Sequence, residues 1–343
     1  MKRLGTLDAS WLAVESEDTP MHVGNLLIFS LPEDAPDTFL QDVLARMKDS
    51  GKVEAPWCYK LAWPGFLGRL LAPYWKDDAN IDLDYHVRHS ALPYPGSERE
   101  LGVLVSRLHS HPLDFSRPLW ECHIIEGLEN NRFALYTKMH HSMIDGISGV
   151  RLMQRVLSTS PSEINMLPAW CVRPEKSRRR ETSGSGMSGL LSQALDAVKE
   201  QAGVTPTLWS AAKRLAHSSL HPGDGPAAPF SGPVSKINHR VTGQRRFATQ
   251  HYQIERLREL AHASGGSLND IVLYLCGTAL RRFLLEQNDL PDAPLTAGIP
   301  VNIRPADDQG TGTQISFMIA SLGTSEADPK SRLLHIMDSP RRA

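Results

Sequence analysis

Two adjacent histidines, closely followed by an aspartate and a glycine, are the residues whose types and spacing best suit acid–base chemistry. They are His140, His141, Asp145 and Gly146 in the segment HHSMIDG. Neutral imidazole can take the proton of an alcohol as its oxygen attacks a thioester, because an ordinary histidine has a pKa of about 6.5. The carboxylate would fix the histidine tautomer or hold the loop through an arginine, and the glycine permits a close backbone approach. The pattern suits a general base for acyl transfer that needs no serine or cysteine nucleophile.

The same residues are open to two other interpretations. The chain has 14 histidines, so a histidine pair at a strand end also arises without function. His140, His141 and Asp145 are in addition plausible zinc ligands. Adjacent side chains of an extended segment point to opposite faces, however, which disfavours one ion shared by both histidines. Residue types alone therefore leave a catalytic base, a metal site and a structural pair as alternatives.

A predicted hairpin and a helix would hold these histidines. Residues 119–126 form a predicted strand, a turn with glycine and asparagine follows, and residues 132–139 form the partner strand. A helical pattern then runs over 147–157. The histidines thus lie in a short connection between a strand and a helix, where side chains are held rigidly and can face a cleft.

The order of the remaining elements predicts an α/β fold with helices packed on sheets. The segment 268–285 is the most apolar predicted helix, and we expect it to lie buried against a sheet. The other predicted elements are strands at 22–30, 295–303 and 314–322, an extended stretch at 236–252, and helices at 37–49, 98–110, 253–264 and 329–337.

Changes in composition divide the chain into two domains. Residues 173–189 are basic and then rich in serine and glycine, and 221–233 are rich in proline and glycine, which is typical of linkers. We predict an N-terminal domain over 1–172, a linker with one helix over 173–235 and a C-terminal domain over 236–343. The last of these has few recognisable strands for a sheet, so we expect it to be incomplete.

The composition is that of an ordinary soluble globular protein, with 41% hydrophobic and 22% charged residues among 343. The net charge of −1 gives no overall attraction to nucleic acid or to an anionic membrane. The spacing of Cys58, Cys122, Cys171 and Cys276 suggests neither a disulfide framework nor a zinc knuckle. No segment resembles a signal peptide or a membrane span, so a cytoplasmic location is expected.

The segment HHSMIDG resembles the H-H-x-x-x-D-G signature of a large acyltransferase superfamily, which includes chloramphenicol acetyltransferase, carnitine acyltransferases and peptide-synthetase condensation domains. Pro118, Leu119 and Trp120 match a Pro-Leu-Trp element, and Asn269 and Asp270 match an Asn-Asp element, of one family within it. The opening stretch LDASWLAVESEDTPMHVG also looks like the start of that family. Over essentially its whole length, the chain resembles the bacterial wax ester synthase/acyl-CoA:diacylglycerol acyltransferases, closely those of marine wax-accumulating bacteria.

The resemblance implies two chloramphenicol-acetyltransferase-like domains, with mixed sheets and packed helices, joined by a crossover linker. It also implies that His141 is the general base, that His140 supports the site, and that Asp145 holds the motif loop. The Pro-Leu-Trp element, Pro118 to Trp120, would line or shape the substrate channel, although a tryptophan is more often a core residue. For Asn269 and Asp270, a helix N-cap with an acidic first turn is at least as good an interpretation as substrate contact.

The implied reaction moves a fatty acyl group from acyl-CoA to a long-chain alcohol or to diacylglycerol, by direct attack and without a covalent acyl-enzyme. Acyl-CoA is a substrate, and no metal or cofactor is required. The CoA phosphates favour basic partners, for which Arg245, Arg246 and Arg304 are candidates. The basic run 176–180 could touch a membrane or lipid inclusion, although a solvated linker is the preferred interpretation. The alternative function is a truncated, non-catalytic remnant that binds acyl-CoA or lipid, since members of the family usually continue beyond residue 343.

Overall fold

The computed structural model forms two compact units. The structure describes residues 2–4, 6–63, 73–144, 146–160, 162–163, 165–172, 232–302 and 315–339. Among these, the residues up to 172 and the segment 241–250 make up the first unit, and the others make up the second. Asp145, Arg304, the basic run 176–180 and most of the predicted linker, including its one helix at about 190–217, lie outside the described residues, so the linker stays a prediction.

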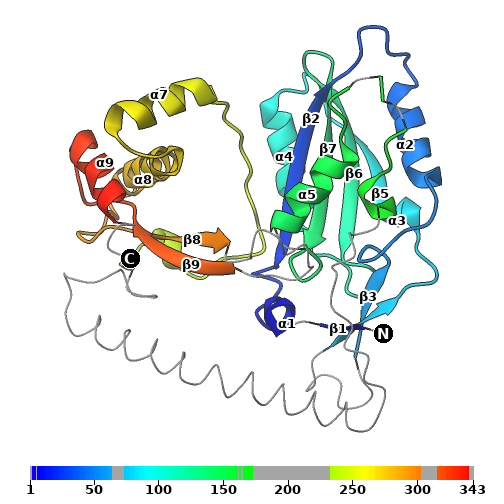
Figure 1. Ribbon diagram of the computed structural model, residues 1–343, viewed down its shortest axis with the longest axis horizontal. Helices are drawn as coiled ribbons and strands as arrows, with labels where there is room; N and C mark the ends of the chain where they lie inside the picture. Colours follow the sequence, from blue (N-terminus) through cyan, green and yellow to red (C-terminus); the bar gives the residue numbers. More distant parts are fainter. Residues whose placement is uncertain are drawn as a thin grey trace. The chain divides into compact units, whose positions relative to one another are not determined.

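A four-stranded mixed sheet forms the centre of the first unit (Figure 1). Its strands, in spatial order, are β2 (His22–Ser30), β7 (Arg132–His140), β6 (Trp120–Leu128) and β5 (Val87–Ala91). The predicted hairpin is confirmed as β6 and β7. Its turn has positive φ at Asn130 and Asn131, which asparagine tolerates better than most residues. β2 runs antiparallel to β7 along its whole length, and this register places His22 opposite His140.

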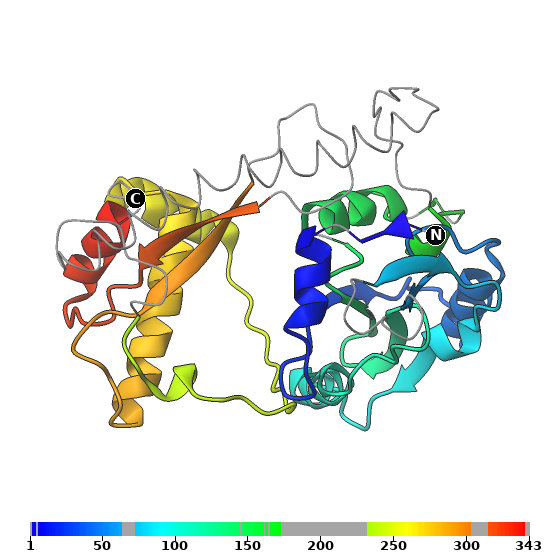
Figure 2. The ribbon, with the colours of Figure 1, turned by 90° about the horizontal axis from the view of Figure 1, so that it is seen from below.

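Helices cover both faces of this sheet. On one face, α4 (Glu98–Ser110) packs Leu101, Leu104 and Val105 against apolar residues of β6 and β7. On the other face, α2 (Phe39–Asp49) and α5 (Gly146–Val156) contribute to a second core that contains three tryptophans. The first unit is therefore a three-layer α/β/α arrangement, which the view from below also shows (Figure 2). Burial on both faces makes the strands a rigid platform for the segment after β7.

Several short elements that the sequence analysis did not predict surround the sheet. A small second sheet has the order β1, β4, β3. The helix α1 packs Ala9 and Leu12 into a further apolar cluster, which also includes Leu119 and Met143. The bounds of these elements are β1 Lys2–Arg3, α1 Thr6–Ala13, β3 Tyr59–Ala62, β4 Tyr74–Asp77, α3 Leu83–His86 and the 3-10 helix η1 Ala169–Cys171.

The segment 241–250, which we call the strap, lies along α4. The Ser106 hydroxyl accepts the Phe247 N–H at 2.7 Å, and the Ser110 hydroxyl accepts the Arg245 N–H at 2.8 Å. A Cβ on Gly102 would stand only 2.8 Å from the Phe247 carbonyl oxygen, so glycine is needed for this approach. Small residues at every fourth position of α4 therefore form a track on which the strap backbone rests.

The second unit has a two-stranded antiparallel sheet with helices packed against it. One side of α8 contributes Leu273 and Leu284 to a core shared with residues of β9 and α9. Val272, Phe283 and Leu285 of the same helix are exposed, so the expected burial of α8 applies to one side only. The elements are η2 (Lys236–Asn238), α7 (Ile254–Ser264), α8 (Leu268–Glu286), β8 (Thr296–Asn302), β9 (Ile315–Ser321) and α9 (Pro329–Asp338).

Candidate active site

The histidine motif lies between the end of β7 at His140 and the start of α5 at Gly146. Backbone hydrogen bonds hold it on two sides. The His140 N–H donates to the Leu119 carbonyl at 2.9 Å, and the His141 N–H donates to the Met21 carbonyl at 2.9 Å. The motif backbone is thus fixed between the segment before β6 and the segment before β2.

His140 is a buried residue whose side chain contacts only other protein groups among the described residues. Its side chain is 1% exposed, and its Nδ1 accepts the Ser142 N–H at 3.1 Å. Since Nδ1 accepts that N–H, the proton of the neutral ring is on Nε2. Nε2 lies 3.4 Å from the Glu15 carboxylate, and the edge of the ring faces Phe115, with ring centroids 5.8 Å apart. Because His140 is enclosed on these sides, it is suited to position its neighbour and is shielded from a substrate.

His141 is the partly exposed member of the pair. Its ring is stacked on the indole of Trp11, with centroids 4.1 Å apart and an interplanar angle of 19°. Its Nδ1 is buried and has no hydrogen-bond partner among the described residues, which do not include Asp145. Of the two histidines, His141 is therefore the one that can meet a reacting group.

Glu15 is a site residue that the sequence analysis missed. Its carboxylate is 14% exposed, faces His140 and accepts the Met21 N–H. Met21 in turn accepts the His141 N–H, so one carboxylate braces both histidines. The pairing of β2 with β7 is the signal that could have found it, because that register carries the residues before His22 to the histidine motif.

A buried neutral histidine stands beside the motif. Burial lowers the pKa of His22 to about 4, although its hydrogen bond to the His109 carbonyl acts in the opposite direction. The His22 Nε2–H donates to that carbonyl at 2.8 Å. His22 is therefore uncharged near neutral pH, and it adds no positive charge next to His140.

An ion pair buried in the sheet stiffens the strands that carry the motif. Lys138 of β7 lies 3.3 Å from the Glu121 carboxylate of β6 and also donates to the carbonyls of Leu108 and His111, at 2.9 Å each. Burial acts to raise the pKa of Glu121, but the His123 hydrogen bond and the Lys138 charge prevail and lower it to about 2. Burial lowers the pKa of Lys138, and the pair ties the hairpin to the end of α4.

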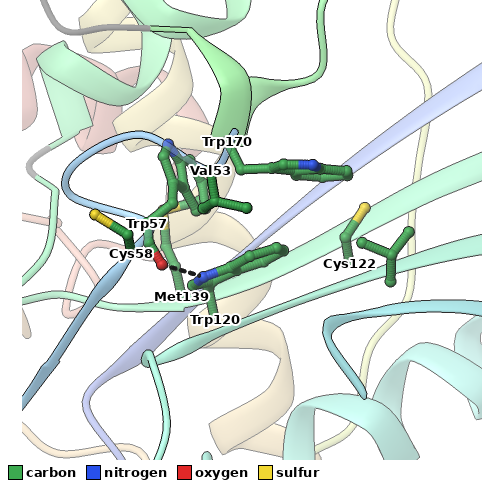
Figure 3. Packing of buried hydrophobic residues seen from close by; sticks show 8 residues of the cluster. Val53, Trp57, Cys58, Trp120, Cys122, Met139 and Trp170 are labelled. Atoms are coloured by element: carbon green, nitrogen blue, oxygen red, sulfur yellow. Dashed lines mark hydrogen bonds between the residues drawn. The ribbon is translucent and has the colours of Figure 1, made fainter. Parts of the chain in front are cut away.

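The Pro-Leu-Trp element lies beneath the motif. Leu119 and Trp120 are both 0% exposed, so their side chains shape the core and do not line an open channel. Trp120 stacks on Trp170 at 5.1 Å and donates its indole N–H to the Trp57 carbonyl at 2.8 Å (Figure 3). Pro118 is also buried, and its carbonyl accepts the Trp120 N–H at 2.9 Å. Through the Leu119 carbonyl, the element helps to place His140.

The Asn269-Asp270 element belongs to the second unit, where it starts α8. Ser267 is the N-cap of this helix. The Asp270 carboxylate accepts the Ser267 N–H at 2.7 Å and its hydroxyl at 2.8 Å, while the Ser267 hydroxyl accepts the Asp270 N–H at 3.2 Å. This is a capping box: Asp270 is the acidic residue of the first turn, as expected, but the N-cap is Ser267, and Asn269 lies inside the helix.

Two further properties concern the described parts of the chain. No three His, Cys, Asp or Glu side chains gather there as a metal site would require, and Asp145 of the alternative zinc site is outside these parts. Within the same ranges, no helix is both long enough and apolar enough to cross a bilayer.

Comparison with known proteins gives consistent matches. Residues 4–272 match a family described as wax ester synthase/diacylglycerol acyltransferase catalytic domain. The chain is 38% identical over 334 residues to the O-acyltransferase WSD of Acinetobacter baylyi, a match that covers 97% of this chain and 70% of that protein. It is 40% identical over 367 residues to the putative diacylglycerol O-acyltransferase Rv3480c of Mycobacterium tuberculosis, which covers 100% of this chain and 73% of that one.

Solved structures agree with these matches. The wax ester synthase/diacylglycerol acyltransferase from Marinobacter aquaeolei VT8 is similar with a TM-score of 0.74 and 33% identity, over 100% of this chain and 72% of that chain. The first condensation domain of the calcium-dependent antibiotic synthetase is similar in fold alone, with a TM-score of 0.54 and 15% identity over 98% of this chain and 73% of that domain's chain.

Proposed function

Because the chain belongs to the wax ester synthase/diacylglycerol acyltransferase family and is an acyltransferase, we propose that it uses His141 as a general base to acylate an alcohol. The donor is a fatty acyl-CoA, and the acceptor is a long-chain alcohol or diacylglycerol. The observation that carries the proposal is the contrast within the histidine pair: His140 is enclosed, while His141 is partly exposed on a fixed backbone.

In the proposed reaction, the hydroxyl oxygen of the acceptor attacks the thioester carbonyl carbon, and His141 takes the hydroxyl proton. The tetrahedral intermediate then collapses, the C–S bond breaks, and His141 returns the proton to the departing thiolate. The products are free CoA and either a wax ester or a triacylglycerol. Ser142 is 4% exposed and bonded to His140, which supports direct attack by the alcohol over a serine-bound acyl intermediate.

The other motif residues have supporting roles in this proposal. His140 keeps the motif backbone in place, Asp145 holds the loop, and Gly146 starts α5. Arg245 is poorly placed for CoA phosphate, since its guanidinium donates to the backbone carbonyls of Asp18 and Thr242. Arg246 and Arg304 stay candidates. Both substrates carry long apolar chains, so we place the reaction at the cytoplasmic surface of a membrane or of a lipid inclusion.

The test is CoA release from palmitoyl-CoA with hexadecanol or dipalmitoylglycerol as acceptor. His141→Ala should lower kcat by roughly 10²- to 10⁴-fold, the usual contribution of a general base. His251→Ala, which alters an exposed histidine, is the matched control and should leave kcat unchanged. Near wild-type turnover by His141→Ala would refute the assignment of the base. A wild-type chain that binds palmitoyl-CoA but releases no CoA with either acceptor would favour the non-catalytic alternative.

A further inference from the structure

The indole of Trp11 lies face to face with the imidazole of His141. The ring centroids are 4.1 Å apart and the planes differ by 19°. Trp11 belongs to α1, and its neighbour Leu12 packs with Leu119 and Met143 in the apolar cluster under the motif. The helix is thus anchored next to the motif, and the indole presents a fixed surface to the base.

A general base needs a fixed ring plane, because the proton transfer depends on its orientation. A hydrogen bond to the second ring nitrogen commonly supplies this. Among the described residues, Nδ1 of His141 has no such partner, and the indole N–H of Trp11 has none either. Trp11 and His141 instead contact each other through the faces of their rings. This stacking restricts rotation about the side-chain bonds of His141.

The stacking of Trp11 on His141 also affects the stability of the protonated, positively charged His141 ring. When His141 takes the alcohol proton, its ring becomes a cation in a partly buried place. A cation within about 6 Å of a tryptophan ring centroid is stabilised by the negative face of the ring. The uncharged ring before proton transfer gains less from this contact, so the stabilisation favours the state in which the proton has moved.

We infer that Trp11 is a positioning residue for His141, which holds the plane of the base and stabilises its protonated form. This inference rests on the proposed function of His141. It assigns a role in the acyl transfer to α1, an element far from the histidine motif in the sequence.

The experiment compares Trp11→Phe and Trp11→Leu in the full chain, with CoA release followed at varied palmitoyl-CoA and hexadecanol concentrations. Trp11→Leu, which lacks an aromatic face, should lower kcat about tenfold, equivalent to about 1.4 kcal/mol. Its KM for palmitoyl-CoA should stay within about twofold of the wild type. Trp11→Phe keeps an aromatic face and should recover most of the lost kcat. Val14→Ala changes an exposed residue just after α1 and is the control that should behave as wild type.

A double-mutant cycle separates this inference from the proposed function. In the His141→Ala background, Trp11→Leu should have no further effect on kcat, because the group that it positions is gone. Equal losses for Trp11→Phe and Trp11→Leu, or the same loss with and without His141, would overturn the role of Trp11. If His141→Ala itself kept full activity, the proposed function would fail, irrespective of the Trp11 variants.

Discussion

The Nδ1 atom of His140 lies 2.7 Å from the hydroxyl oxygen of Ser142 and accepts the backbone N–H of the same residue. With the Glu15 carboxylate 3.4 Å from Nε2, this geometry superficially resembles a serine–histidine–acid triad. Ser142 is 4% exposed, however, and its backbone N–H also donates to the ring, so we expect it to orient His140.

Ser142→Ala therefore distinguishes an orienting serine from a nucleophile. We expect kcat to fall less than about tenfold, since one hydrogen bond to the ring is lost and the backbone bond remains. A nucleophilic serine would instead lose several orders of magnitude. Mass spectrometry of the wild-type chain, incubated with palmitoyl-CoA and no acceptor, should show no acylated protein. An acyl adduct that disappears in Ser142→Ala would contradict direct attack.

Glu15→Gln tests the carboxylate that braces both histidines. Glutamine retains an oxygen that can accept the Met21 N–H, but it removes the charge that faces Nε2 of His140. Loss of a charged partner in a largely buried site costs more than a neutral hydrogen bond, so we expect kcat to fall about tenfold or more. Glu17→Gln, which alters an exposed residue two positions later, serves as the control. Equal activity of the two variants would remove Glu15 from the site.

Trp120→Phe tests whether the Pro-Leu-Trp element acts through the core. The change leaves the Trp57 carbonyl without its indole donor in a buried place, which costs about 1–3 kcal/mol of unfolding free energy. Urea unfolding should show this loss, while KM for palmitoyl-CoA stays close to that of the wild type. Trp63→Phe, at a side chain that is 47% exposed, should change stability by less than about 0.5 kcal/mol. A raised KM in a variant of unchanged stability would instead indicate a channel-lining residue.

Ser267→Ala and Asp270→Ala together test the cap of α8. Each removes one half of the capping box, so each should lower stability by about 1 kcal/mol and leave KM unchanged. If Asp270 also contacts substrate, only Asp270→Ala will raise KM. Thermal unfolding and steady-state kinetics on the two variants decide between these outcomes.

The buried His22 predicts a loss of stability in mild acid. Its pKa in the folded protein is about 4, lowered by burial from the ordinary 6.5, so the unfolded chain takes up a proton at a higher pH than the folded one. The free energy of unfolding is therefore unaffected by the titration of His22 above about pH 6.5, and it decreases as the pH falls from 6.5 to 4. The difference of about 2.5 units corresponds to roughly 3 kcal/mol. His22→Gln retains a donor for the His109 carbonyl without this titration, so urea unfolding should show a smaller loss over the same interval. An identical pH dependence of the two proteins would contradict the burial of a neutral His22.

The elements that follow local periodicity could be predicted from the sequence. The helix at 98–110 and the strand at 22–30 have the predicted bounds, because their apolar spacing and turns are local signals. What could not be predicted depends on contacts between distant segments. Glu15 near His140 depends on the pairing of β2 with β7, and the parallel pairing of β5 with β6 depends on a crossover through α4. Periodicity also could not show that one side of α8 is exposed.

The strap has a consequence for the order of events during synthesis. Ser110 and Ser106 of α4 accept N–H groups that are 135 and 141 residues later in the chain. A ribosome adds residues at about 5–20 per second. Ser106 and Ser110 of α4 are therefore synthesised many seconds before the residues whose N–H groups they accept. Until then, the side of α4 that carries Ser106 and Ser110 lacks the strap. The strap can bind there only when Arg245 and Phe247 have left the exit tunnel.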